Sequence, residues 1–475
     1  MFDRASAMKA MFEPRIVAHV GASETGLYPA DVFRSLLSSK AAVFAVNPNR
    51  SEVFGERSYP SLAELPERPD LAVITVRAEL VPDVLARCVD AAIPAALVFA
   101  SGFAEAGREG TTLQRRLEEF ADKILVLGPN CAGFANISGQ VVATRLYSKL
   151  RSGSVSFVSQ SGALMMALHG SFSEGRVGLR FLVSVGNQLN LTIESILCHF
   201  ADDPPTKVAA VFLEGISDGT GFVEALKRNM DEGKPVVILR AGRTSVGRRL
   251  AETHTAAVAG SARVLEAMCR QFGAVLVDDV GELISVSRLF EVFGRKITGR
   301  IAYLTQSGGL GSLTGDLAKL AGLDPRPLSA GLQKLLRDRR IVPEQQTLLN
   351  PVDLRGDAMR GRAIVENAAP FFEDAETDVV VLLFAKNPNR EVEQETASGV
   401  IELSRRYEKP LLVVWVGDFE EEDRPGVSAV KTIRRAGIPV FTEPGAAVRA
   451  IAMVDGYYRF RNGLEGGAHG NARVS

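Results

Sequence analysis

Short apolar runs alternate with helical patterns along most of this 475-residue chain. The runs consist mainly of aliphatic residues, which predicts buried strands, and the stretches between them repeat apolar residues at helical spacing. The clearest helical patterns are Leu80–Ala91, Thr111–Ala121 and Thr192–Phe200. Alternation of this kind favours an α/β protein with doubly wound parallel sheets. The predicted strands begin after Arg15 and continue at Ala42–Val46, Leu71–Val76, Ala95–Phe99, Ile124–Leu127, Ser154–Val158, Phe181–Val185, Val208–Leu213, Val236–Leu239, Gly299–Leu304, Asp378–Phe384, Pro410–Val416 and Pro439–Phe441.

One long connection interrupts this pattern. After Val236–Leu239 the next helical pattern is Ala262–Gln271, with Ser261 in the N-cap position, so a loop of about 20 residues is predicted between them. Loops of this length in a compact domain are usually functional. The loop contains His254, whose imidazole can act as a base, metal ligand or nucleophile. Three guanidinium groups favour an anionic reaction partner such as phosphate: Arg243, Arg248 and Arg249. The simpler interpretation is a surface histidine.

Net charge, the length of the apolar runs and the cysteine spacing exclude several classes of protein. The formal net charge is −1, which indicates neither nucleic-acid nor membrane-surface binding. No apolar run approaches the ~18 residues of a membrane span, and the N-terminus lacks the apolar core of a signal peptide, so we expect a cytoplasmic protein. The cysteines show no CxxC spacing, which predicts no disulfide and no structural metal site. They are Cys88, Cys131, Cys198 and Cys269.

Small and polar residues follow the predicted strands of the first third of the chain. Gly21, Ala22 and Ser23 form a turn in which backbone N–H groups can approach a phosphate, although the turn is not a full GxGxxG motif. Asn47-Pro48-Asn49-Arg50 offers no carboxylate to a ribose, which argues against NAD, whereas Arg50 suits a phosphorylated nucleotide. Ser101-Gly102 follows a further strand. Ligands of parallel sheets bind at these carboxyl ends.

Two further turns and a carboxylate are candidates for a second site. Asn130 and Cys131 lie in the turn GPNCAG, which is equally consistent with a structural Pro-Asn turn around a buried thiol. Ser159, Gln160, Ser161 and Gly162 place donors at a strand-to-helix junction, which suits an anion or simple N-capping. Glu214 follows Val208–Leu213 and is placed to hydrogen-bond an imidazole or to face solvent.

The last third repeats the strand–turn–helix pattern. Gly308 and Gly309 follow Thr305-Gln306-Ser307, much as Gly162 follows Ser159-Gln160-Ser161. The length predicts about three domains. We place them at residues 1–145, 146–295 and 296–460, followed by a disordered tail, 461–475, that is rich in Gly, Asn and Ala.

Taken in order, several motifs resemble the NDP-forming acyl-CoA synthetase family. From Phe12 to Tyr458 they read VGAS, VNPN, SGFAEAG, GPNCAG, SQSGA, SVGN, LEGI, GRTSVGRRLAETHTAAVAG, QSGGLG and NPVD. The resemblance implies a Rossmann-like CoA-binding domain followed by two flavodoxin-like ligase domains.

The resemblance also implies roles for individual residues. His254 matches the histidine that becomes phosphorylated, and Glu214 matches the carboxylate that steadies it. Phosphate-binding residues would be Ser159, Gln160, Ser161, Gly162, Gly308 and Gly309. Coenzyme-binding residues would be Gly21, Ala22, Ser23, Asn47, Pro48, Arg50, Ser101, Gly102, Asn130 and Cys131, with Cys131 serving packing or positioning rather than covalent chemistry.

The implied reaction interconverts acyl-CoA, phosphate and ADP with acid, CoA and ATP through an acyl phosphate and phospho-His254. No ATP-grasp segment follows Tyr458, so we expect a separate ATP-grasp β subunit that holds ADP or ATP with Mg²⁺, in a hetero-oligomer. Four residues depart from the family pattern: Arg77, Ala132, Thr253 and Ala256. Two alternatives stay open: an acyl- or carbamoyl-transfer component that uses no nucleotide, and a non-catalytic CoA-binding regulator.

Overall fold

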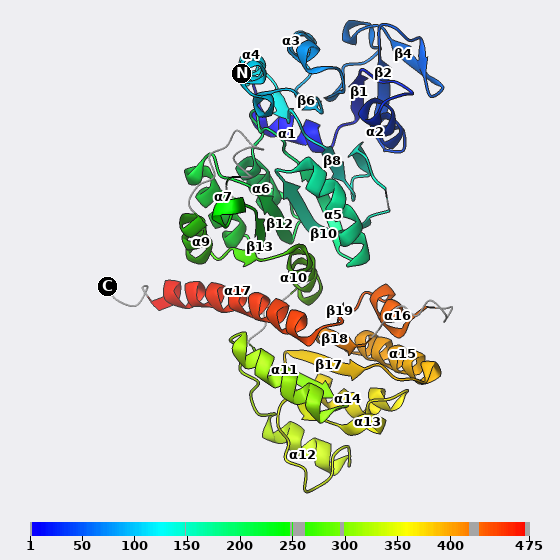
Figure 1. Cartoon of the computed structure of the whole chain (residues 1–475), viewed down its shortest axis with the longest axis vertical. Coiled ribbons are helices and arrows are strands. Elements are labelled where there is room, and N and C mark those ends of the chain that lie inside the picture. The colour runs from blue at the N-terminus through cyan, green and yellow to red at the C-terminus, as the bar shows by residue number, and fades with distance from the viewer. Residues whose placement is uncertain are drawn as a thin grey trace. The chain divides into compact units, whose positions relative to one another are not determined.

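The computed structural model describes residues 2–147, 149–247, 249, 262–294, 299–417 and 427–470. They form two compact units, Met1–Ser287 (the N-terminal unit) and Arg288–Ser475 (the C-terminal unit). The N-terminal unit contains two sheets and the C-terminal unit contains one, counted over the described residues (Figure 1).

The first sheet of the N-terminal unit has the strand order β3-β4-β2-β1-β5-β6-β7. All neighbouring strands are parallel except the antiparallel pair β3–β4. Without β3 this is the 3-2-1-4-5-6 order of a Rossmann sheet, which confirms the predicted fold of this part. The strands are β1 Ile16–Val20, β2 Ala42–Val46, β3 Glu52–Val53, β4 Glu56–Tyr59, β5 Leu71–Ile74, β6 Ala95–Val98 and β7 Leu125–Leu127; the helices are α1 Arg4–Phe12, α2 Leu27–Leu37, α3 Val81–Asp90 and α4 Arg108–Glu118, with 3-10 turns η1 Leu62–Glu64, η2 Ala78–Leu80 and η3 Ala104–Ala106.

The second sheet has the order β14-β13-β12-β10-β11-β8-β9. Its five parallel strands follow the 2-1-3-4-5 order of flavodoxin, as predicted, and the hairpin β8–β9 adds to β11 in antiparallel sense. The strands are β8 Gly133–Asn136, β9 Val141–Thr144, β10 Arg151–Ser159, β11 Gly178–Ser184, β12 Val208–Leu213, β13 Val236–Arg240 and β14 Val275–Val277; the helices are α5 Gly162–Glu174, α6 Ile193–Asp202, α7 Gly219–Asp231 and α9 Ala262–Gln271. The boundary between the two units falls within the next helix, α10 Val280–Phe293.

The C-terminal unit repeats the flavodoxin order with the parallel sheet β16-β15-β17-β18-β19. Its central strand β17 is buried over almost its whole length, as expected for a parallel strand covered on both faces. The strands are β15 Ile301–Thr305, β16 Val352–Asp353, β17 Val379–Ala385, β18 Leu411–Val416 and β19 Val440–Phe441; the helices are α11 Gly308–Leu320, α12 Ala330–Asp338, α13 Arg355–Ala358, α14 Ala363–Glu373, α15 Arg390–Arg406, α16 Ala429–Arg435 and α17 Pro444–Gly470.

Two observations bear on the predicted domain ranges. The hairpin β8–β9 lies before residue 145, yet it pairs with the second sheet, so sheet membership changes after β7 rather than at 145. The tail that we predicted from residue 461 begins within α17, which extends to Gly470. A helix that is already formed adds one hydrogen bond for each further residue, so low intrinsic propensity alone does not stop it. Residues 471–475 lie outside the described chain.

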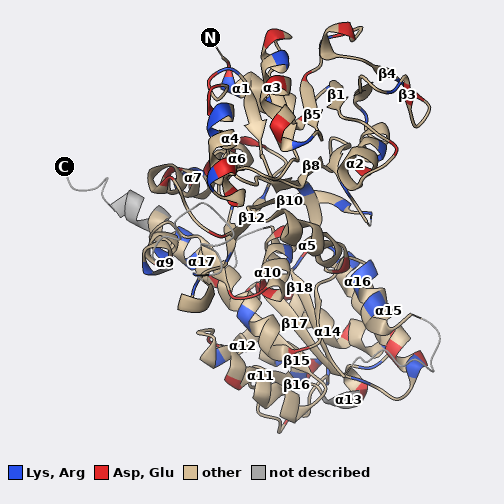
Figure 2. Ribbon diagram, turned by 45° about the horizontal axis from the view of Figure 1, so that its top comes forward, with Lys and Arg blue, Asp and Glu red and all other residues tan. Residues whose placement is uncertain are grey.

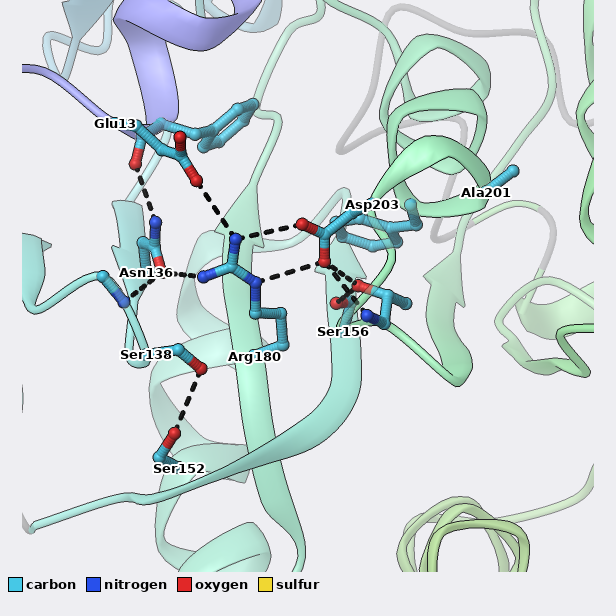
Figure 3. Close-up of polar contacts among 12 residues, drawn as sticks. Glu13, Asn136, Ser138, Ser152, Ser156, Arg180, Ala201 and Asp203 are labelled. Carbon is cyan, nitrogen blue, oxygen red and sulfur yellow. Dashed lines mark hydrogen bonds and ion pairs between the residues drawn. The ribbon is translucent and has the colours of Figure 1, made fainter. Parts of the chain in front are cut away.

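A buried arginine links four elements of the N-terminal unit (Figure 3). Arg180, on β11, donates two hydrogen bonds to Asp203 after α6, at 3.1 and 3.0 Å. It also donates to Asn136 on β8 at 2.7 Å and to Glu13 after α1 at 3.1 Å. This network joins the helix that precedes the first sheet to the hairpin and the core of the second.

Charges of both signs are spread over the outer helices, for example α4 and α15 (Figure 2). This distribution accords with the formal net charge of −1. Within the described residues, no helix has both the length and the apolar character that a membrane span requires.

Candidate functional site

A cavity of about 440 Å³ lies at the carboxyl ends of β1, β2 and β5 in the first sheet. Three residues that we predicted for coenzyme binding line it: Gly21, Asn47 and Pro48. The Asn47 side chain donates to the Ala22 carbonyl at 2.9 Å, so the two predicted turns are joined. Ser23 and Arg50 lie on the same turns but do not line the cavity. Because β1 and β5 flank the point where the strand order reverses, the cavity lies where such sheets bind ligands.

The floor of this cavity leaves no room for a side chain at Gly21. Gly21 has φ of +90°, and a Cβ there would come within 2.9 Å of Val76 Cγ1. Below it, the fully buried His19 contacts Thr75 Oγ1 through Nε2 at 2.9 Å. Burial lowers the pKa of His19 to about 3. The imidazole is therefore neutral near pH 7 and supports Thr75, which lines the cavity.

Acid is expected to destabilise the folded chain through His19. The free imidazole has a pKa near 6.5, whereas His19 stays neutral until about pH 3, so between these values only the unfolded chain takes up the proton. From pH 7.5 to 5 the free energy of unfolding should fall by about 2 kcal/mol from this group. Urea unfolding at pH 7.5 and at pH 5 measures this change in the free energy of unfolding. His19→Gln, which does not titrate, should reduce the fall by that amount, and an unchanged pH dependence would refute the assignment.

The charges around the cavity suit a phosphorylated nucleoside. Arg77 and Arg87 line it together with one carboxylate, Asp83, while Leu62 and Val76 contribute apolar surface. Guanidinium groups bind phosphate, and apolar walls accept a base. Arg77 stood out in the sequence as a departure from the family pattern. Arg87, on α3, was missed because an exposed arginine on a helix carries no distinguishing signal.

The predicted phosphate turn follows β10. Ser161 caps α5 by accepting from the Leu164 N–H at 3.3 Å, and the Ser159 hydroxyl accepts from the Ser161 N–H at 3.1 Å. The turn therefore holds its shape through its own hydroxyl groups and opens at a helix N-terminus, where the local field favours an anion.

Gln160 joins this turn to the end of the neighbouring strand β12. Its Oε1 accepts from the backbone N–H groups of Glu214 and Gly215, at 2.5 and 3.0 Å. Its Nε2 donates to the Gly215 carbonyl at 2.8 Å. The structure thus brings Ser161 and the half-buried Glu214 to the same edge, at the point where the strand order of the second sheet reverses.

The GPNCAG turn packs against this turn. A Cβ on Gly162 would lie 3.0 Å from the Ala132 Cβ, and the Ala132 N–H donates to Ser184 Oγ at 3.1 Å. The Cys131 thiol is buried, which raises its pKa to about 12. A thiol that stays protonated is a poor nucleophile, so its environment fits packing.

Glu105 and Asn187 were not singled out from the sequence, although both lie in quoted motifs. Glu105 follows β6 and accepts from the backbone N–H groups of Gly102 and Phe103 at 2.6 and 3.2 Å. Asn187 follows β11 and contacts Glu105 and Asn130. Ser101 is exposed beside this group. The contact between the SGFAEAG, GPNCAG and SVGN motifs depends on where β11 ends, which the sequence does not show.

The C-terminal unit carries the same turn. The Thr305 hydroxyl accepts from the Ser307 N–H at 3.0 Å, and Ser307 caps α11 through the Leu310 N–H at 3.4 Å. Gln306 donates to the Ala385 carbonyl at the end of β17 at 2.9 Å, as Gln160 does to Gly215. Gly308 and Gly309 begin α11 beside this turn. The predicted likeness of the two turns therefore extends to their hydrogen bonds.

His254, Thr253, Ala256 and Arg248 lie outside the described residues. The flanks of their loop are described: a cavity of about 190 Å³ at the ends of β13 and β14 is lined by Arg240, Arg243 and Arg270 together with Glu266. Arg243 forms an ion pair with Asp278.

Comparisons with known proteins agree with this architecture. Residues 15–137 match the CoA binding domain family, and residues 152–290 match the succinyl-CoA ligase like flavodoxin domain. The alpha subunit of ADP-forming acetate–CoA ligase II from Pyrococcus furiosus is 30% identical over 469 residues, covering 96% of this chain and 99% of that subunit. The chain belongs to the NDP-forming acyl-CoA synthetase family.

Other members of this synthetase family are longer. ADP-forming acetate–CoA ligase I of Archaeoglobus fulgidus is 31% identical over 454 residues, covering 95% of this chain but 64% of that protein. A solved structure of acetyl-coenzyme A synthetase 1 from Ca. Korarchaeum cryptofilum, in complex with phosphate and ADP, has a TM-score of 0.88 and 29% identity, and covers 97% of this chain and 98% of that one. The synthetase fold extends over nearly the whole chain.

Proposed function

We propose that this chain is the α-type subunit of an ADP-forming acyl-CoA synthetase. The observation that carries the proposal is the Gln160 side chain, which ties the Ser159–Gly162 turn to Glu214 at the reversal point of the second sheet. This arrangement unites an anion-binding helix end with a carboxylate that can orient an imidazole. The family's ligase members favour this function over the two alternatives that the sequence left open.

The proposed reaction begins with a thioester. Phosphate attacks the acyl carbonyl, the C–S bond breaks, and CoA leaves as the thiol after taking up a proton. An imidazole nitrogen of His254 then attacks the phosphorus of the acyl phosphate and releases the carboxylate. ADP finally takes the phosphoryl group and becomes ATP. Phosphoryl transfer depends chiefly on positioning and on donors around the phosphate oxygens, and the helix end at Ser161 supplies such donors.

Coenzyme A is proposed to bind the 440 Å³ cavity of the first sheet. The backbone can approach closely at Gly21, and Arg77 and Arg87 offer charge to its phosphate groups. The pantetheine arm would extend along the strand ends toward Asn130 and Cys131. The cytoplasm is the proposed compartment.

A partner subunit of the ATP-grasp class is proposed to hold ADP or ATP with Mg²⁺. The Pyrococcus furiosus relatives are named as alpha subunits and match this chain over almost their full length. The Archaeoglobus fulgidus relative extends well beyond the matched part, which leaves room there for such a function on one polypeptide.

Reconstitution tests this proposal. The purified chain, an ATP-grasp subunit, acetyl-CoA, phosphate and ADP should together form ATP and free CoA in equal amounts, measured by luciferase and by a thiol reagent. Omission of either subunit should abolish ATP formation. ATP formation that does not require this chain, or CoA release without any need for phosphate, would refute the proposal.

A further inference from the structure

A chain of side-chain hydrogen bonds connects the strand ends of the two sheets in the N-terminal unit. Asn187 Nδ2 donates to Glu105 Oε2 at 2.5 Å, and Asn130 Nδ2 donates to Asn187 Oδ1 at 3.2 Å. Glu105 and Asn130 follow strands of the first sheet, whereas Asn187 follows β11 of the second. All three residues are half-buried, so each keeps part of its surface in contact with solvent.

The carboxylate determines the direction of these hydrogen bonds. An ionised carboxylate only accepts, so the atom of Asn187 that faces Glu105 must be the NH₂ group. Burial alone would raise the pKa of Glu105, but hydrogen bonds from Asn187, Gly102 and Phe103 hold it below its usual value. Asn187 Nδ2 has a second acceptor, Gln114 Oε1, at 3.0 Å.

The orientation of Asn187 in turn orients Asn130. With its NH₂ group held by Glu105, Asn187 turns Oδ1 toward Asn130, which must then present its own NH₂ group. The two turns also touch through the backbone: the Asn187 N–H donates to the Pro129 carbonyl at 2.9 Å. A Cβ on Gly186 would lie 2.3 Å from that carbonyl oxygen, so only glycine permits this contact.

We propose that Glu105 is a positioning residue for the coenzyme: acting through Asn187, it sets which side of the Asn130 amide donates and which accepts. The inference rests on the proposed function, which brings the thioester end of coenzyme A to Asn130. The pantetheine amides and the thioester carbonyl are directional partners. A reversed Asn130 amide presents a donor where an acceptor is needed, and both groups then stay unsatisfied.

Reversing the polarity of one contact tests the proposal. Glu105→Gln keeps the shape and the acceptor for Gly102 and Phe103 but places an NH₂ group opposite that of Asn187. In the reconstituted enzyme, kcat/KM for acetyl-CoA should fall about 10- to 100-fold, the range expected for small misplacements of a reacting group. KM for ADP should not change. Adding Asn187→Asp restores the donor–acceptor pair with residue 105 and still accepts from Asn130, although it gives up the donor to Gln114, so part of the rate should return.

Thr206→Val provides the matched control for stability. Thr206 is buried at the opposite edge of the second sheet, where its hydroxyl contacts Asp203 at 2.6 Å and Ser156 at 2.7 Å. Loss of this hydroxyl should lower the free energy of unfolding, measured in urea, and leave kcat/KM at the wild-type value. If Glu105→Gln behaves in the same way, or if Asn187→Asp fails to recover its rate, the positioning role is overturned.

Measurements on the wild-type chain distinguish a failure of the proposed function from a failure of the positioning role. Calorimetry with coenzyme A and turnover of acetyl-CoA are measured first. A wild-type enzyme that neither binds coenzyme A nor consumes acetyl-CoA contradicts the proposed function, and the positioning role falls with it. An active wild type whose Glu105→Gln variant keeps full kcat/KM contradicts the positioning role alone.

Discussion

Replacing His254 with alanine is expected to abolish phosphorylation of this chain and ATP formation by the reconstituted enzyme. In the proposed reaction the phosphoryl group passes through one imidazole nitrogen, and no other group takes its place. The loss of turnover should be on the order of 10³-fold or more, as for other covalent nucleophiles. Labelling with γ-³²P-ATP in the presence of the ATP-grasp subunit measures it, because phosphohistidine is labile in acid and stable in base.

Two controls sharpen this prediction. His469, near the end of α17, is the matched histidine, and His469→Ala should be labelled as the wild type is. The His254→Ala chain should still release CoA from acetyl-CoA when phosphate is present, because the acyl phosphate forms before the histidine reacts. Acid-labile label that persists on the His254→Ala chain would remove this residue from the mechanism.

The positions of the strands were predictable from the sequence, and with them the edge that carries the candidate site. β2 and β12 begin and end as predicted. β12 is buried over its whole length, and a parallel strand covered on both faces reads as one apolar run. The small and polar residues that follow these strands gather at one edge because neighbouring parallel strands end there. Gly21 and Asn47 line one cavity for that reason.

The partners of the side chains were not predictable in the same way. Glu105 and Asn187 are 82 positions apart, and nothing in either motif says that β11 ends beside β6. The hairpin β8–β9 was also missed, although it carries the chain from the GPNCAG turn into the second sheet. Strand order is a property of the packed sheet, and an apolar run in the sequence does not specify which strands will pair with it.

The role of Gln160 was predictable only in part. The SQSGA motif identifies a turn that can hold an anion, and the resemblance to a ligase family adds phosphate to that interpretation. The hydrogen bonds of the Gln160 side chain with the backbone of Glu214 and Gly215 depend on the pairing of β10 with β12, which the sequence does not give. The same amide contact from Gln306 to Ala385 indicates that the glutamine joins neighbouring strand ends in both sheets.

Replacing Arg180 with methionine is expected to be the most destabilising single change among the described residues that we consider. The guanidinium is 6% exposed and forms two hydrogen bonds with Asp203, which is 8% exposed. Removing one partner leaves a buried carboxylate without its counter-charge, which typically costs about 3–5 kcal/mol. Urea unfolding at pH 7 measures the loss, and a cost below about 1 kcal/mol would show that the pair contributes no more than a surface ion pair.

The control is Arg228 on α7, whose partner Asp202 is the last residue of α6. Arg228 pairs with Asp202 at 2.6 Å, but both side chains are about half exposed, so Arg228→Met should cost less than about 1 kcal/mol. The double variant Arg180→Met/Asp203→Asn should regain part of the lost stability, because the amide carries no charge to bury and still reaches Thr206. If the double variant is less stable than Arg180→Met, charge burial is not the cause.

The pH dependence gives an independent check. Burial alone would raise the pKa of Asp203, but hydrogen bonds from Arg180 and Thr206 hold it below its usual value. The ion pair therefore contributes its full stability above the pKa of an unfolded aspartate, about 4, and loses it as the pH falls through the lower folded value. Without Arg180, burial raises the pKa of Asp203, so the stability gap between wild type and Arg180→Met should begin to shrink above about pH 4 and continue to shrink below it. A gap that comes only from lost packing against Phe181 would stay constant.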